Sequence, residues 1–193
     1  YKNGFFLMLP EPNDPDATLD INLIENLFDA QADAYRLAHL LDNENIADVN
    51  QAICDGKTTE LILSCEAIFN NNLSLIAQEI INAGKKFVFL AGPSSSGKTS
   101  TAYRLAYALR SYGIIPRVIS ADNYYLDYAD RRIDENGNPD FESIYALDLD
   151  KFNDDMQALM RGEEVELPYY NFKTGKREYN GNIIDLGDKD ILI

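Results

Sequence analysis

The clearest chemistry in the sequence lies in one run of small residues that ends in a lysine and two hydroxyl residues: Gly92-Pro93-Ser94-Ser95-Ser96-Gly97-Lys98-Thr99-Ser100. This run fits the pattern G-x-x-x-x-G-K-[ST], in which a glycine-rich backbone wraps its N–H groups around a phosphate. The pattern assigns Lys98 to the β- and γ-phosphates of a nucleotide and the Thr99 hydroxyl to Mg²⁺. We therefore predict that the run binds these phosphates and that Thr99 is a metal ligand.

The sequence on both sides of this run favours a phosphate-binding loop. Residues 86–91 are a short apolar run rich in Phe, which predicts a buried strand. After the loop, apolar residues recur at helical spacing until Gly113, where we expect the helix to end. Strand, loop and helix thus follow in the order that the motif requires. A Ser/Gly-rich linker would have no reason to lie between a strand and a helix.

Asp122 is the second residue placed for chemistry. Residues 117–120 predict another strand, and the interval between Lys98 and Asp122 suits one helix and a return to a neighbouring parallel strand. Asp122 then follows the C-terminal end of that strand, at the edge where ligands bind in open α/β sheets. A carboxylate there can accept the proton of an attacking hydroxyl, while Lys98 neutralises charge on the transferred phosphoryl group. The alternative is an aspartate that only caps a turn.

Helices fill the chain before residue 86. Apolar spacing predicts helices at 24–41, 46–54, 59–69 and 73–83, the last two separated by Asn70-Asn71-Asn72. This part contains no catalytic constellation. We therefore expect a mainly α-helical linker or subdomain over residues 1–85 and the N-terminal part of a P-loop domain over residues 86–193.

Capping and turn residues predict the elements near the end of the chain. Asp148 or Asp150 can cap a helix that ends at Gly162. Residues 165–172 and 177–179 then flank a turn, which predicts a hairpin, and a last strand begins near Asp190. Together with the strands around the loop, these elements indicate the α/β class with a parallel sheet.

Composition excludes several classes of ligand and site. The chain has 193 residues and a formal net charge of -15, which argues against a broad surface for nucleic acid or anionic membrane. Cys54 and Cys65 show no partner pattern, so we expect reduced core or helix residues. His39, the only histidine, cannot form a metal site by itself. Since no apolar run is long enough for a membrane span or a signal peptide, we expect a cytoplasmic protein.

Four stretches follow one another in an order known from one enzyme family. They are 91–99, 120–125, 140–148 and the run Leu167-Pro168-Tyr169-Tyr170-Asn171-Phe172 followed by Arg177. Together they resemble the uridine kinase and phosphoribulokinase family of P-loop kinases, over roughly residues 86–193. The chain looks closest to the long bacterial form, in which regions similar to the N-terminal part of threonyl-tRNA synthetase precede the kinase. The resemblance implies a three-layer P-loop NTPase fold, with ATP and Mg²⁺ as cofactors.

The resemblance also implies roles for single residues. Asp122 matches the acidic residue that serves as base toward a nucleoside 5′-hydroxyl. Residues of the acceptor pocket are implied at Tyr124, Glu142, Tyr170 and Arg177, with Glu142 as a carboxylate that binds the ribose. The tyrosines can equally be packing residues. Gly175 stands where the family has a histidine that helps to recognise the base, so the identity of the acceptor stays open.

We therefore predict an ATP-dependent kinase whose acceptor is the 5′-hydroxyl of uridine or cytidine. One alternative is a kinase for another small hydroxyl compound, such as a sugar phosphate. The other is a nucleotide-operated switch module without a small-molecule acceptor. The long loop with tyrosines before Glu142 favours a kinase, since a switch needs no acceptor pocket. The expected partners are ATP and a small molecule rather than nucleic acid or membrane. The sequence does not decide whether the protein forms homo-oligomers.

Both ends of the chain predict an internal fragment. The chain begins at Tyr1 without a methionine and stops at Ile193, inside an expected strand. The parallel sheet would then be incomplete. We expect the isolated fragment to be inactive, because the resemblance implies a further acidic residue and lid arginines after Ile193.

Overall fold

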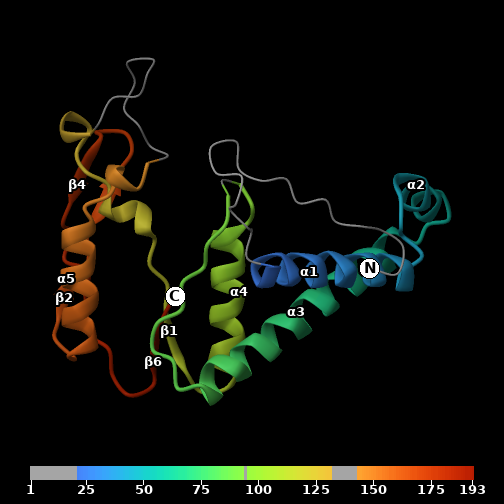
Figure 1. The fold of residues 1–193 in the computed structure, drawn as a ribbon, viewed down its shortest axis with the longest axis horizontal. Coiled ribbons are helices and arrows are strands. Elements are labelled where there is room, and N and C mark those ends of the chain that lie inside the picture. The colour runs from blue at the N-terminus through green and yellow to red at the C-terminus, as the bar shows by residue number, and fades with distance from the viewer. Residues whose placement is uncertain (1–20, 94, 132–142) are drawn as a thin grey trace. The chain divides into compact units, whose positions relative to one another are not determined.

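The computed structural model describes residues 21–93, 95–131 and 143–193 (Figure 1). Contacts between residues divide the chain into two compact units, Tyr1–Ala67 and Ile68–Ile193. The boundary lies inside helix α3 (Thr58–Asn82), so the last turns of this helix belong to the second unit. Of the helices in the described ranges, none is both long and apolar enough to cross a membrane.

Residues 21–67, the described part of the first unit, are mainly helical. Its helices are α1 (Ile21–Leu40), α2 (Ile46–Cys54) and the first turns of α3. A capping box starts α2: the Asn45 side chain accepts the N–H groups of Ala47 and Asp48, and the Asp48 carboxylate accepts the Asn45 N–H. Cys54 lies on α2 and Cys65 on α3, as expected of helix residues. Both are free and exposed, so they lie outside the core.

The expected helix break at residues 70–72 is wrong, because α3 runs without interruption from Thr58 to Asn82. Asparagine lowers helix stability by at most about 0.7 kcal/mol and, unlike proline, keeps its backbone donor. Beyond the asparagines, Leu73 and Ala77 are buried in a core that they share with α4 (Lys98–Ser111). This packing stabilises the helix across three residues of poor propensity.

The main core of the second unit lies between the end of α3, α4 and a small parallel sheet. Leu73 and Ala77 pack with Leu105 and Leu109 of α4, and Ile191 joins them from the sheet. After α4, Gly113 has a φ of 79°, the left-handed conformation with which helices commonly end. The predicted helix after the loop and its end near Gly113 are confirmed.

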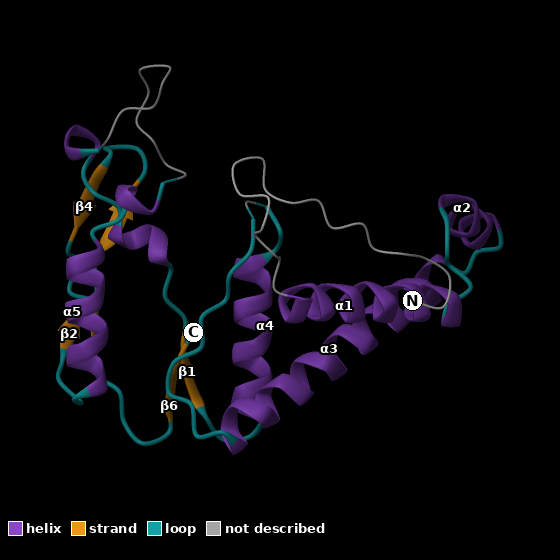
Figure 2. Cartoon of the chain, viewed as in Figure 1, coloured by secondary structure: helices purple, strands orange, loops and turns teal. Residues whose placement is uncertain are grey.

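The order of the parallel sheet differs from the predicted one. Strand β6 (Asp190–Leu192) pairs with β1 (Ile115–Arg117) in parallel (Figure 2). On the opposite edge of β6, Leu192 bridges Phe87. We expected β1 to be the neighbour of the segment before the loop. This is wrong, because β6 lies between them. Every residue of β6 is buried, which suits the central position in a parallel sheet.

The segment before the loop is less buried than predicted. Lys86 to Val88 bond to Leu192, and the Val88 N–H lies 2.8 Å from the Leu192 oxygen. Phe89, however, is 76% exposed. In the described part of the chain this segment is paired along one edge only, and pairing ends at Val88. The prediction of a buried strand at residues 86–91 is therefore wrong.

A second group of elements lies between β1 and β6 in the chain. Its helices are the 3-10 helices η1 (Ala121–Tyr124), η2 (Tyr128–Asp130) and η3 (Ile144–Ala146) and the α-helix α5 (Leu149–Met160). Its strands are β2 (Val165–Glu166), β3 (Tyr169–Asn171), β4 (Lys176–Glu178) and β5 (Ile183–Ile184). β3 and β4 form the predicted antiparallel hairpin, and β2 pairs with β5.

The start of α5 was predicted correctly. Asp148 caps it, because its side chain accepts the Lys151 N–H at 3.0 Å. The apolar face of α5 then packs on a second core with Tyr124, Leu167 and Leu192. Through this core, α5 covers η1, the short helix that follows β1.

Candidate active site

The loop before α4 depends on two glycines for its shape. A Cβ on Gly92 would lie 2.8 Å from the Ser96 hydroxyl oxygen, so a larger residue would force the Ser96 side chain to move. Gly97, directly before α4, has a φ of 86°, which glycine adopts without strain. Ser95 has a φ of 60°, rare for a residue with a side chain. Both glycines of the predicted motif therefore have a steric reason.

Lys98 and the start of α4 make the loop suitable for an anion. Lys98 Nζ donates to the carbonyl oxygens of Gly92 and Pro93, each at 2.8 Å, and so lies over the loop. The first N–H groups of a helix have no partner within it, and the helix dipole adds partial positive charge at this end. Thr99 and Ser100 belong to this first turn and are exposed. The loop residues thus fit the phosphates of a nucleotide.

One cavity of about 350 Å³ lies between the start of α4 and the residues that follow β1. Lys98 and Thr99 line it from α4, and residues 120–123 line it from η1. Asp122 is exposed, and the Ser120 hydroxyl, not the Asp122 carboxylate, caps η1 by accepting the Asp122 N–H at 3.3 Å. Capping therefore does not account for this carboxylate. The structure brings Lys98, Thr99 and Asp122 to the same cavity.

Two tyrosines that the resemblance places in the acceptor pocket are buried by packing. Tyr124 and Tyr170 are each 1% exposed, and neither lines the cavity beside the loop. Tyr124 packs edge-to-face on Phe152, with 5.1 Å between ring centres. Tyr170 packs in the same way on Tyr125 and Phe172, at 5.5 and 5.0 Å. In this structure both rings serve as packing residues.

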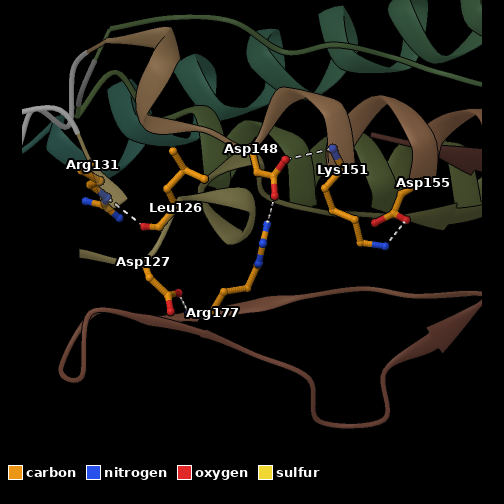
Figure 3. A network of polar contacts seen from close by, with 7 residues as sticks. All are labelled: Leu126, Asp127, Arg131, Asp148, Lys151, Asp155 and Arg177. Atoms are coloured by element: carbon orange, nitrogen blue, oxygen red, sulfur yellow. Dashed lines mark hydrogen bonds and ion pairs between the residues drawn. The ribbon is translucent and has the colours of Figure 1, made fainter. Parts of the chain in front are cut away.

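Arg177 is bound to the start of α5 (Figure 3). Its guanidinium donates to Asp148 Oδ2 at 2.8 Å, and its backbone N–H donates to Asp127 Oδ1 at 2.8 Å. Burial opposes ionisation of Asp148, but the Lys151 N–H and the Arg177 guanidinium together lower the pKa of that carboxyl. Arg177 therefore joins the hairpin to the helix that covers η1.

Sequence reasoning missed the buried charges around η1. Arg131 is 6% exposed, and its guanidinium stacks on the rings of Tyr125 and Tyr170. Asp155 is 4% exposed and forms an ion pair with Lys151 at 2.7 Å. The spacing of Lys151 and Asp155 on a predicted helix is a signal that could have found this pair. No local pattern marks the burial of Arg131, because rings distant in sequence supply it.

Among the described residues, no group of three or more His, Cys, Asp or Glu side chains is placed to hold a metal ion. A metal at the loop would therefore depend on the Thr99 hydroxyl and on the phosphates of the nucleotide, which suits the way Mg²⁺ is commonly bound. Ser94 and Glu142, which were also predicted as site residues, lie outside the described residues.

Comparison with known proteins concerns the part of the chain that contains this site. The model of the Phosphoribulokinase / Uridine kinase family matches residues 87–193. A protein named uridine kinase from Oceanobacillus iheyensis is 31% identical over 104 residues, which are 54% of this chain and 48% of that protein. Another from Halobacterium salinarum is 27% identical over 103 residues, 53% of this chain and 44% of that protein. The chain thus spans about half the length of the curated relatives that it matches.

A solved structure shares the fold. It is described as a possible uridine kinase from Bacillus stearothermophilus and aligns with a TM-score of 0.53, covering 63% of this chain and 68% of that chain. The sequence identity is 23%, so this likeness concerns the fold alone.

Proposed function

The chain belongs to the Phosphoribulokinase / Uridine kinase family, and from this premise we propose that it forms part of an ATP-dependent kinase that phosphorylates a hydroxyl group of a small molecule. The observation that carries the proposal is the shared cavity of Lys98, Thr99 and Asp122, because it joins a phosphate site to a carboxylate. The first candidate acceptor is the 5′-hydroxyl of uridine or cytidine. The names of the relatives support this choice.

The residues of the cavity have distinct parts in the proposed reaction. When bound, ATP with Mg²⁺ would supply the phosphoryl group. Residues 92–100 hold the phosphates through backbone N–H groups, and Thr99 is the proposed metal ligand. Lys98 exchanges its bonds to the loop carbonyls for phosphate oxygens and stabilises the charge that develops during transfer. Asp122 accepts the proton of the acceptor hydroxyl.

The acceptor side of the proposal follows the resemblance. We propose Tyr124, Glu142, Tyr170 and Arg177 as residues near the acceptor. Tyr124 and Tyr170 are each 1% exposed, so in this proposal their rings support the acceptor site from the packed interior.

A second candidate is a kinase for another small hydroxyl compound, such as a sugar phosphate. Gly175 supports keeping it: the φ of this residue is 67°, and a Cβ would lie 3.0 Å from the Tyr128 Cβ. A larger residue is therefore disfavoured at this position, and a base could not be recognised there by a side chain. A regulatory switch without an acceptor is supported less, because it gives no role to the exposed Asp122 in the cavity.

The organisation of the protein is proposed in the same terms. We assign residues 86–193 to the N-terminal part of a three-layer P-loop kinase domain and residues 1–85 to a mainly helical linker or subdomain. The cytoplasm is the proposed compartment, since the site is built for ATP and a metabolite. Homo-oligomers are compatible with the proposal.

Turnover of an acceptor panel by the full-length protein tests the proposal. The panel contains uridine, cytidine, a purine nucleoside and phosphorylated pentoses, and ADP release and product mass are measured together. Phosphorylation of a pyrimidine nucleoside supports the first candidate, and phosphorylation of a pentose phosphate supports the second. ATP binding without turnover of any acceptor would contradict both and leave the switch.

A further inference from the structure

Two buried polar atoms close to η1 lack hydrogen-bond partners. They are the Tyr124 hydroxyl oxygen and Asp155 Oδ2, and neither has a partner at hydrogen-bond geometry among the described residues. The first can donate and the second can accept. Unpaired burial of such groups is unfavourable, whereas apolar residues of similar size would fill the same space without that penalty. Packing alone therefore does not explain these two side chains.

The two side chains already influence each other. Burial raises the pKa of the Tyr124 phenol most strongly, and the Asp155 carboxylate raises it further through its charge and a side-chain interaction. The phenol therefore stays protonated at neutral pH and remains a donor. Asp155 Oδ1 accepts from Lys151 Nζ at 2.7 Å (Figure 3), which holds the carboxylate and leaves Oδ2 for the Tyr124 hydroxyl.

Tyr124 also connects this pair to the cavity. It is the last residue of η1, and Asp122 lies on the same short helix. The Tyr124 carbonyl accepts the Asp148 N–H at 2.8 Å, and its ring packs on Phe152, so both its backbone and its side chain are attached to the α5 region. A shift of the Tyr124 backbone would therefore also shift Asp122, which lies two residues earlier on this short helix.

We propose that Asp155 is a positioning residue for Asp122: its Oδ2 accepts a hydrogen bond from the Tyr124 hydroxyl in the working site and thereby fixes η1. In this proposal Asp155 contacts neither ATP nor the acceptor, and it acts only through Tyr124. This inference rests on the proposed function, in which Asp122 is the base. Because a displacement of reacting groups by about 1 Å can lower a rate by about 10²-fold, the bond affects the chemical step and not nucleotide binding.

Kinetics of four variants of the full-length protein test the positioning role. We expect Tyr124→Phe and Asp155→Ala each to lower kcat by about tenfold, with the KM for ATP unchanged. The double variant should be no slower than either single one, because both changes remove the same bond. Asp155→Asn should have a kcat between those of the wild type and Asp155→Ala, since its one amide oxygen accepts from either the phenol or Lys151 Nζ, and its N–H₂ group then faces the other donor. A wild-type kcat for Tyr124→Phe, or losses that multiply in the double variant, would overturn the proposal.

Hydrogen exchange gives a second readout that does not require turnover. The N–H groups of Asn123 and Tyr125 bond to the carbonyls of Ser120 and Asp122 within η1. Their exchange should accelerate in Tyr124→Phe and Asp155→Ala, while exchange in α4 should not change. Unchanged exchange in η1 would overturn the positioning role, whether or not an acceptor is known. Failure of the acceptor panel with faster exchange would instead contradict only the proposed function.

Asp154→Ala is the matched control for both experiments. Asp154 is the neighbour of Asp155 on α5 but is exposed, and it lines no part of the cavity. Its substitution should change neither kcat nor the exchange of η1. An effect equal to that of Asp155→Ala would overturn the proposal, because it would assign the loss to the charge of α5 as a whole.

Discussion

The close approach of Gly92 to Ser96 predicts the effect of one added methyl group in the loop. In Gly92→Ala the new Cβ would lie 2.8 Å from Ser96 Oγ and 3.4 Å from Lys98 Cγ. The exposed Ser96 side chain has to leave its rotamer, or the backbone has to shift, which is unfavourable by about 0.5–1.5 kcal/mol. If the loop must recover its shape to bind phosphate, the Kd for ATP rises by roughly 2- to 12-fold.

Calorimetric titration of folded Gly92→Ala with ATP and Mg²⁺ measures this change. Ser96→Ala removes the clashing oxygen, so Gly92→Ala combined with Ser96→Ala should regain most of the lost affinity. Gly113→Ala is a control for a glycine outside the loop: its φ is 79° and its Cβ would meet nothing within 4 Å, so it should lower stability without weakening ATP binding. An unchanged Kd in Gly92→Ala, or a double variant as weak as the single one, would refute the steric argument.

Three further predictions concern single charges. Lys98→Ala should weaken ATP binding at least several-fold without unfolding the protein, which titration and circular dichroism check together. Asp122→Asn in the full-length protein should lower single-turnover phosphorylation by about 10²-fold or more while the Kd for ATP stays the same; near-normal turnover would remove Asp122 as the base. The hydrogen bond that His39 Nδ1–H donates to Glu44 Oε1 at 2.5 Å raises the pKa of His39 above its ordinary value, so NMR titration should find it above 6.5 and Glu44→Gln should lower it toward that value. Because the folded-state pKa is the raised one, this pair stabilises the protein below about pH 6.5 and loses its effect as pH rises through the folded-state pKa.

Local patterns predicted those parts of the fold that depend on neighbouring residues. The loop, α4, the Asp148 cap of α5 and the hairpin of β3 and β4 all follow from turn chemistry, capping or periodicity within a few residues. The asparagines at 70–72 misled the prediction, because packing of Leu73 and Ala77 outweighs a weak propensity.

The remaining features depend on contacts between distant residues. The position of β6 between Phe87 and β1 could not be predicted from spacing. The length of a crossover connection does not determine whether the two strands that it joins are neighbours or have another strand between them. For the candidate site, motif and sheet edge located Lys98, Thr99 and Asp122. Residue type did not reveal that Tyr124 faces the core, because tyrosine suits both a pocket and a packed interior.

The central position of β6 has a consequence for how the molecule folds. Leu192 bridges Phe87 across 192 minus 87, or 105, positions of the chain. During synthesis, the segment before the loop and β1 therefore stay unpaired until β6, which is made long after both, leaves the ribosome. Helix α4 and the end of α3 can pair early, since their contacts are closer in sequence. We expect the loop to acquire its final shape late in folding, and the apolar residues around Phe87 to need protection from aggregation until then.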